Sequence, residues 1–404
     1  MTMTAERPQT TSERIPNTGC FTVSYREFLA VLRAVGVAVG RARNLPVLSR
    51  VMVTVGAGEV EVTAFDFDLA VTIPLPVRAA VAGRMLLDHA ATVKVLQAAV
   101  KGVPARDLDR LEVTVSAVDN QPELGVAGYR VPLDDSVTVD AFPALPPAVP
   151  GGHTVGRDDF TTLVTRVAVA ADKDGSLPLL TGIRTRLTHR LVEMVATDRY
   201  RVACGTAPAV GADTAAILLP CGPLTALLPH LTGPQVTIGV TSMGGDSWAT
   251  ITSGHLIARV RGIVGDYPPV ERLLHRAPTD TLIVDRQALL TAATRATAIS
   301  AAVAAKTTPV RLTVNPTGLI LAPANDHSPT RVTAPLVPAL AGSVDTSWTT
   351  GLNPAYLLDA VKSLTTDQVI LYLADQAPVM LTDDGAARVT YQHMMMPVRL
   401  AHDT

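Results

Sequence analysis

Three aspartates are the residues of this chain whose type and spacing could support catalysis or metal binding. Asp66 and Asp68 lie two positions apart, so at the end of a β-strand both carboxylates would point to the same side. Such a pair could act as general acid and base or could bind a divalent cation. Asp198 holds the matching position of a second, similar stretch, with Arg201 nearby. Because the feature occurs twice, we interpret it as part of the fold; an enzyme that uses these carboxylates is the alternative.

No other pattern in the sequence indicates a catalytic, metal or cofactor site. The nine histidines are scattered without an HExxH pair, and neither a GxxxxGK[ST] phosphate loop nor a GxSxG elbow occurs. Cys20, Cys204 and Cys221 match neither a disulfide framework nor metal-ligand spacing, which favours a reducing compartment. We therefore expect a protein that is not an enzyme and that needs neither a cofactor nor a metal.

An internal repeat is the strongest pattern in the chain. Four sets of matching residues lie 132 positions apart: Phe28 and Phe160, Leu45-Pro-Val-Leu48 and Leu177-Pro-Leu-Leu180, Asp66 and Asp198, and Leu86-Leu87 and Leu218-Leu219. A weaker third copy centres on Thr308-Pro-Val310, after a helix-like stretch at 285–306. The repeat predicts three related domains at 20–147, 153–276 and 280–404, joined by Pro- and Gly-rich segments.

Within a repeat, the hydrophobic periodicity alternates between helix and strand. Residues 24–38 place Phe28, Leu29, Leu32 and Val35 on one helical face. Residues 50–56 and 59–63 alternate like strands around a Gly-Ala-Gly turn, a helix is expected at 86–100, and strands are expected at 111–117 and 124–131. The predicted fold class is α+β, with two helices on one face of a mostly antiparallel sheet in each repeat. Three such units could form half of a ring that a second chain completes head to tail.

Length, composition and charge narrow the class of protein. The 404 residues suggest about three domains, and 48% hydrophobic with 17% charged residues favours packed domains over a disordered chain. The net charge of -2 argues against nucleic-acid binding over the whole surface but permits a local basic lining. Residues 1–19 have no apolar core and predict a disordered tail, not a signal peptide. No stretch approaches the ~18 apolar residues of a membrane span, so we expect a soluble, cytoplasmic protein.

Basic residues gather on or beside the predicted helices. They are Arg26, Arg33, Arg41, Arg43, Lys94, Lys101, Arg166, Lys173, Arg286, Arg295, Lys306 and Lys362. Solvated helix faces explain most of them individually. If the helices line a channel, the same residues would contact phosphates in a weak, salt-sensitive and sequence-independent way that permits sliding.

Several stretches, taken together in their order and spacing, resemble one known family. They are Leu45-Pro-Val-Leu-Ser49, Leu177-Pro-Leu-Leu-Thr-Gly-Ile183, Val195-Ala-Thr-Asp-Arg-Tyr-Arg-Val202, Asp266-Tyr-Pro-Pro-Val-Glu-Arg-Leu-Leu274, Leu352-Asn-Pro-Ala-Tyr-Leu-Leu-Asp359 and Met396-Pro-Val-Arg-Leu400. Across residues 20–400 the chain is similar to the β subunit of bacterial DNA polymerase III, the sliding clamp. The resemblance implies a processivity factor: two three-domain chains, joined head to tail as a homodimer, form a ring around duplex DNA.

The resemblance also implies a hydrophobic pocket between the second and third domains, which receives short linear motifs of the polymerase, the clamp loader and repair proteins. One side would comprise Leu180, Thr197, Arg199, Tyr200, Arg201, Val202, Pro268, Arg272 and Leu273. The other side would comprise Asn353, Tyr356, Pro378, Met394, Met396, Pro397, Val398, Arg399 and Leu400. Apolar walls suit the Leu or Phe anchors of an extended peptide, and Arg201 and Arg272 suit its backbone and acidic neighbours.

The resemblance further implies contacts with DNA and with a second copy of the chain. It places DNA contacts at Arg41, Arg43 and Lys173. It places the dimer interface between strand residues such as Val131 and Leu133 of one chain and the helix around Ile299 of the other. No membrane contact is implied.

The sequence also departs from the family pattern around the pocket. Ala401-His-Asp-Thr404 follows the usual terminal Arg-Leu pair, Met394-Met395 replaces branched aliphatics, and His275 stands where Pro is usual. One hypothesis is a divergent second clamp copy whose altered pocket evades a clamp-directed inhibitor. A dimeric scaffold that never meets DNA is a further alternative.

Overall fold

The computed structural model describes residues 19–40, 45–56, 58–118, 121–134, 136–274, 278–303, 308–324, 332–374 and 377–400. They form two compact units. The first comprises the residues up to Pro147 together with 255–259, and the second comprises 148–254 and 260–404. The expected boundary between a second and a third domain stays a prediction, because both ranges belong to the second unit. None of the described helices is long and apolar enough to cross a membrane.

The first unit combines antiparallel sheets with helices. Its elements are β1 (Gly19–Ser24), α1 (Tyr25–Val35), β2 (Arg50–Val55), β3 (Glu59–Phe65), β4 (Leu69–Pro76), β5 (Ala79–Val81), β6 (Gly83–Asp88), α2 (His89–Ala99), β7 (Glu112–Val118), β8 (Gln121–Val126) and β9 (Tyr129–Pro132). One sheet has the strand order β5-β1-β7-β8-β9. In the other, β6, β2, β3 and β4 pair in that order. Helix α1 buries Phe28, Leu32 and Val35, as its periodicity predicts.

The second unit contains two further rounds of the same element order. The first round comprises β10 (His153–Gly156), α3 (Arg157–Ala168), β11 (Gly182–Leu187), β12 (Leu191–Thr197), β13 (Arg201–Val210), β14 (Ala215–Pro220), α4 (Cys221–Leu227), β15 (Gln235–Met243), β16 (Asp246–Ser253) and α5 (Glu271–Leu274). Strand β17 (Leu256–Arg261) follows β16 in the chain, and its residues 256–259 belong to the first unit. The other comprises β18 (Asp280–Asp285), α6 (Arg286–Val303), β19 (Val310–Asn315), β20 (Gly318–Pro323), β21 (Leu336–Ser343), β22 (Trp348–Leu352), α7 (Pro354–Ser363), β23 (Gln368–Leu373), β24 (Val379–Asp383) and β25 (Thr390–Met395).

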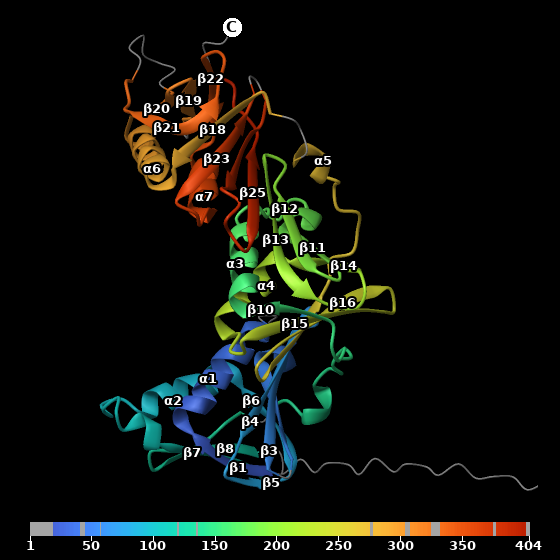
Figure 1. Ribbon diagram of the computed structural model, residues 1–404. Helices are drawn as coiled ribbons and strands as arrows, with labels where there is room; N and C mark the ends of the chain where they lie inside the picture. The colour runs from blue at the N-terminus through green and yellow to red at the C-terminus, as the bar shows by residue number, and fades with distance from the viewer. Residues whose placement is uncertain are drawn as a thin grey trace, which may run out of the picture. The chain divides into compact units, whose positions relative to one another are not determined.

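A single antiparallel sheet runs through the second unit. Strands β14, β11, β12, β13, β25, β24, β23 and β18 pair in that order. The two rounds of elements meet where β13 pairs with β25, with Arg201 opposite Met395 and Val202 opposite Met394. Figure 1 shows β13 in green beside β25 in red. Backbone hydrogen bonds therefore join the two rounds at the outer strand that each contributes to this sheet.

The repeated residues hold equivalent places in the fold. Phe28 on α1 and Phe160 on α3 are both buried, and each helix follows directly on a strand. The Leu-Pro stretches form matching 3₁₀ turns at 46–49 and 178–181, in which Leu48 and Leu180 are buried. The predicted α+β class with mostly antiparallel sheets is confirmed.

One predicted helix begins later than expected. Residues 86–88 belong to strand β6, where Leu86 pairs with Met52 of β2, and α2 starts only at His89. The Asp88 side chain caps this helix by accepting the N–H of Ala91 at 2.7 Å. A short apolar run suits a buried strand as well as a helix, so periodicity alone placed the boundary wrongly.

Candidate functional site

Asp66 and Asp198 build matching turns. The Asp66 Oδ1 atom accepts the N–H groups two and three residues further along, at 3.1 and 2.7 Å. Asp198 Oδ1 makes the same two contacts, at 3.0 and 3.1 Å. The residues between them, Phe67 and Arg199, adopt left-handed backbone angles, with φ of 76° and 79°. Because both carboxylates serve to stabilise turns, their geometry favours the interpretation that they are part of the fold.

Asp66 and Asp198 differ in their electrostatic surroundings. Burial raises the pKa of Asp66 above its usual value, and the backbone hydrogen bonds that it accepts oppose the shift. Asp198 forms an ion pair with Arg201 at 3.0 Å. Within the described ranges, no group of three or more His, Cys, Asp or Glu side chains is placed to hold a metal ion.

Arg201 lies beneath the expected pocket and not at its surface. Its side chain is 4% exposed, and its guanidinium contacts Asp198 at 3.0 Å and Asp359 of α7 at 2.7 Å. It also lies 4.3 Å from the centre of the Tyr356 ring. We expected Arg201 to meet acidic residues of a bound peptide, but its charge is already neutralised internally. Its place in the structure is instead that of a link between β13 and α7.

A second buried ion pair joins the two rounds of elements. Arg166 of α3 pairs with Asp383 of β24, and the two side chains are 4% and 3% exposed. The Arg166 guanidinium lies 4.3 Å from the Tyr391 ring, whose hydroxyl lies 2.9 Å from the Arg166 carbonyl oxygen and 2.8 Å from His393 Nδ1. Burial lowers the pKa of His393 to about 3, so this imidazole is neutral near pH 7. Arg166, which we expected on a solvated or DNA-facing helix surface, is therefore a core residue.

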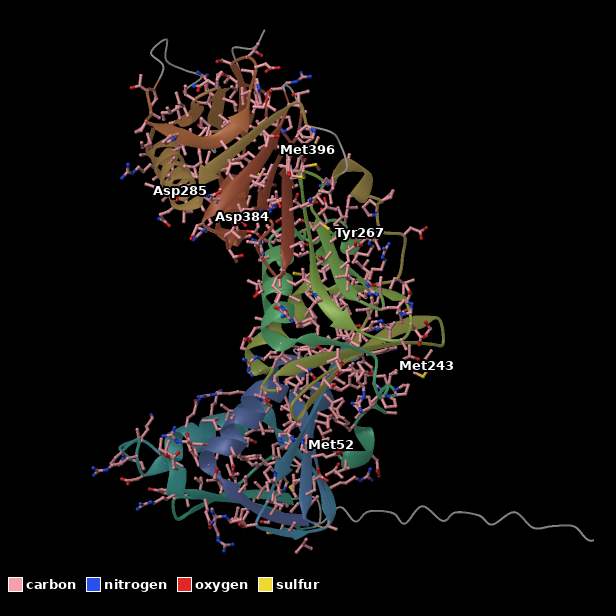
Figure 2. All side chains as sticks on the ribbon, in the orientation of Figure 1. Met52, Met243, Tyr267, Asp285, Asp384 and Met396 are labelled. Atoms are coloured by element: carbon pink, nitrogen blue, oxygen red, sulfur yellow. The ribbon has the colours of Figure 1, made fainter. Side chains whose placement is uncertain are left out.

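An apolar cluster packs on the face of β13 opposite to Arg201. It comprises Val195, Val202, Val270, Leu274 and Met394, with Cys204, Tyr267 and Met380 packed against it. Burial raises the pKa of Tyr267 to about 12. In Figure 2, Met396 lies where β25 ends, and Tyr267 lies beside β12 of the same unit. The cluster gives the expected pocket an apolar floor.

The predicted pocket residues divide into a buried and an accessible set. Leu180, Thr197, Arg201, Val202, Met394 and Leu400 are buried. Pro268, Asn353, Tyr356, Pro378 and Pro397 are half-buried, whereas Arg199, Tyr200, Leu273, Met396, Val398 and Arg399 are exposed. The Arg272 side chain lies outside the described residues, as do His275 and residues 401–404. The exposed apolar members are the ones that a partner could contact directly.

Backbone contacts fix the segment that carries several of these residues. The Met396 N–H donates to the Tyr200 carbonyl at 2.8 Å, and the Val398 N–H donates to the Gly351 carbonyl at 2.8 Å. The Asn353 side chain caps α7 by accepting the N–H groups of Ala355 and Tyr356. Asn353 is therefore occupied with the helix and positions Tyr356 at its first turn.

Leu273, Pro378 and Met394 also line a cavity of about 30 Å³. That is far smaller than the roughly 300 Å³ of a typical small-ligand pocket. Binding here would therefore depend on the exposed apolar side chains around the cavity more than on the cavity itself.

The other predicted contact residues have varied positions. Arg41 and Arg43 lie outside the described residues, while Lys173 is exposed next to α3. Ile299 is exposed on α6 and lines an apolar cavity of about 380 Å³ with residues such as Leu336. Val131 is half-buried on the edge strand β9. Leu133, which we expected at the dimer interface, is only 7% exposed and packs in the first unit.

Sequence reasoning missed the polar residues that join the two rounds. Asp359 was part of a recognised stretch but was given no role, and Asp383, Tyr391 and His393 were not singled out. The available signal was the presence of polar residues in stretches that are otherwise apolar and therefore expected to be buried, because buried polar groups need partners. The partners of Asp359 and Asp383 are more than 150 positions away in the sequence and could not be identified from it.

Comparison with known proteins identifies relatives of both rounds of the second unit. The model of the DNA polymerase III beta subunit, central domain, matches residues 154–269, and that of the C-terminal domain matches 271–398. The beta sliding clamp of Streptomyces coelicolor is 25% identical over 366 residues, covering 88% of this chain and 93% of that protein. The beta sliding clamp homolog GriR of Streptomyces muensis is 25% identical over 370 residues, covering 88% and 92%.

Solved structures share the fold over nearly the whole chain. The DNA polymerase sliding clamp of Bacillus subtilis superimposes with a TM-score of 0.82 at 18% identity, covering 95% of this chain and 99% of that one. The Pseudomonas aeruginosa sliding clamp bound to griselimycin gives a TM-score of 0.81 at 21% identity, covering 95% and 100%.

Proposed function

Because the chain belongs to the family of the bacterial DNA polymerase III β subunit, we propose that it is a sliding clamp, a ring that encircles duplex DNA in the cytoplasm and tethers a polymerase to it. The observation that carries the proposal is the family match of residues 154–269 and 271–398, within a fold likeness that covers 95% of the chain. On this proposal the protein catalyses no reaction and needs no cofactor. It retains DNA because the ring is closed, while contacts such as Lys173 add weak, salt-sensitive attraction.

The proposed partner site is the junction of β13 and β25. Tyr200, Leu273 and Met396 expose apolar surface there above a buried apolar cluster. Peptide motifs with Leu or Phe anchors, from the polymerase, the clamp loader and repair proteins, would cover these side chains. Adaptable methionines suit a site that accepts many partners.

The proposed ring is a head-to-tail homodimer. Strand β9 pairs with β8, and within the described ranges no strand pairs with its other edge. The apolar cavity beside Ile299 on α6 is the complementary surface that a second copy would cover. Ile299→Asp should yield monomers in light scattering, whereas Leu191→Asp, at an exposed site on β12, should leave the molar mass of the dimer unchanged. A wild-type chain that is a stable monomer would contradict the ring.

The deciding test of the function is retention on DNA of different topology. A clamp loaded onto nicked circular DNA by a clamp loader should stay bound and should leave when the circle is linearised. A scaffold that never meets DNA would not be retained on the circle. Prompt loss from the circle in the presence of an active clamp loader would refute the proposal.

A finer proposal is that this chain is a divergent clamp copy with altered inhibitor sensitivity. The similarity to the clamp homolog GriR supports it, as do Met394 and Met395, which stand where the family usually has branched aliphatics. The chain should bind a standard clamp-binding peptide normally but bind griselimycin more weakly than the Streptomyces coelicolor clamp does. Equal affinities of the two clamps for both ligands would remove this proposal.

A further inference from the structure

The turn between β12 and β13 holds Arg199 in a backbone conformation that side chains rarely adopt. Its φ of 79° lies in the left-handed region, where glycine is the residue without a steric penalty. The Thr197 hydroxyl and the Asp198 carboxylate fix the turn by accepting the N–H groups of Arg199 and Tyr200 at 3.1 and 3.0 Å. A strained residue that persists in an exposed turn calls for a reason other than stability.

The equivalent turn of the first unit shows that this backbone does not require arginine. Phe67 occupies the same position relative to Asp66, with φ of 76°. The centres of the Phe67 and Phe65 rings are 5.4 Å apart. The two turns therefore share their backbone and their aspartate but differ in the side chain that they present. Of these two described turns, the one at the partner site of the second unit presents a cation.

Arg199 is also the cation at this turn whose charge is free. Its neighbour Arg201 is buried and paired with Asp198 and Asp359. The Arg199 side chain is exposed, and its guanidinium lies 5.7 Å from the centre of the Tyr200 ring. Within the part of the chain that the structure describes, no carboxylate is paired with it.

The Arg199–Tyr200 pair borders the apolar part of the site. The Tyr200 carbonyl accepts the Met396 N–H at 2.8 Å, so the turn and the segment after β25 are held side by side. Tyr200 and Met396 are 55% and 40% exposed. A peptide whose apolar anchor covers Met396 would thus bring its neighbouring residues within reach of the guanidinium.

We propose that Arg199 determines partner specificity by selecting peptides that carry an acidic residue beside their apolar anchors. This inference rests on the proposed function of the site. The guanidinium can donate two parallel hydrogen bonds to a carboxylate while its face lies on the Tyr200 ring. The turn, which presents Phe67 in the first unit, would here present a cation to the partner.

The test compares matched peptides on matched variants. The probes are pairs of short peptides with Leu and Phe anchors. The two peptides of a pair differ only at one flanking position, which is Asp in one and Asn in the other, and each pair tests a different flanking position. Affinities for the full chain are measured by fluorescence anisotropy at about 50 and about 500 mM NaCl, because salt screens an exposed ion pair. The variants are Arg199→Gly, Arg199→Lys and the control Arg190→Ala, which removes an exposed charge at the other end of β12.

The wild type and Arg190→Ala should bind the best Asp peptide about 3- to 5-fold more tightly than its Asn match at low salt. Arg199→Gly should bind the two about equally, Arg199→Lys should be intermediate, and high salt should abolish the difference. Arg199→Gly should also raise the unfolding temperature, because glycine relieves the turn. A lower unfolding temperature would show that Arg199 serves the fold and would overturn the inference.

The same experiment separates failure of this inference from failure of the proposed function. If the wild type and every variant bind the Asp and Asn peptides with equal affinity, the proposed partner site is supported and the role of Arg199 is refuted. If the wild type binds neither peptide, the proposed partner site itself fails, and the inference fails with it.

Discussion

The buried pair between Arg166 and Asp383 offers a direct test of how the two rounds of the second unit are held together. Asp383→Asn removes one charge but keeps an oxygen that can accept the Thr365 and Thr366 N–H groups, which contact Asp383 Oδ1 at 3.0 and 3.4 Å. The variant leaves the Arg166 guanidinium, 4% exposed, without its counter-charge. Breaking a buried ion pair in this way costs about 3–5 kcal/mol.

Chemical and thermal unfolding should both report this loss. A cost of that size should lower the unfolding temperature of the second unit by about 6–20 °C. The matched control is Glu123→Gln, which breaks the exposed pair with Arg130 and should cost less than about 1 kcal/mol. The double variant Arg166→Met with Asp383→Leu removes both charges and should lose much less than the sum of the two single losses.

The result that would refute this reasoning is a small effect of the single variant. If Asp383→Asn loses no more than Glu123→Gln, the guanidinium finds water or another partner when its carboxylate is gone. Additive losses in the double variant would likewise show that the two charges do not act as a pair.

Three further predictions follow from the same core and surface. Because burial lowers the pKa of His393 from 6.5 to about 3, the unfolded chain binds a proton between those pH values that the folded chain does not. The free energy of unfolding should therefore rise with pH in that range by up to ~1.4 kcal/mol per pH unit. Urea titrations of His393→Gln should lack this rise, and a slope equal to that of the wild type would contradict the prediction. Asp198→Asn should lower the free energy of unfolding by about 1–3 kcal/mol, because it removes the ion pair with Arg201. Asp66→Asn should change it little, because the amide oxygen of asparagine still accepts the turn N–H groups. Equal losses of stability in thermal unfolding of the two variants would contradict this difference. Lys173→Ala should reduce the slope of DNA affinity against salt by about one phosphate contact, and an unchanged slope would remove Lys173 from the DNA surface.

Local features of the fold could be predicted because the repeat records them twice. Phe28 and Phe160 are buried at the same position of equivalent helices, and Asp66 and Asp198 stabilise equivalent turns. In each pair, one residue supported the interpretation of the other. The start of α2 could not be placed, because an apolar run such as Leu86-Leu87 suits a strand and a helix equally well.

The candidate site could be predicted as a set of residues but not as a set of roles. The sequence does not reveal that Arg201 is neutralised by Asp359, which lies 158 positions further along the chain. For the same reason it did not show that Arg166 is buried against Asp383. Pairings between distant residues depend on how strands meet, and neither periodicity nor composition contains that information.

The pairing of β13 with β25 also affects how the protein can be made. Thr206 of β13 meets Thr390 of β25, a residue 184 positions further along the chain. At a synthesis rate of about 5–20 residues per second, the nascent chain presents that edge of β13 unpaired for roughly 10–40 s before its partner strand exists. An uncovered strand edge can template pairing with other chains. Ribosome-bound intermediates of this protein should therefore depend on chaperone protection until the last strand leaves the exit tunnel.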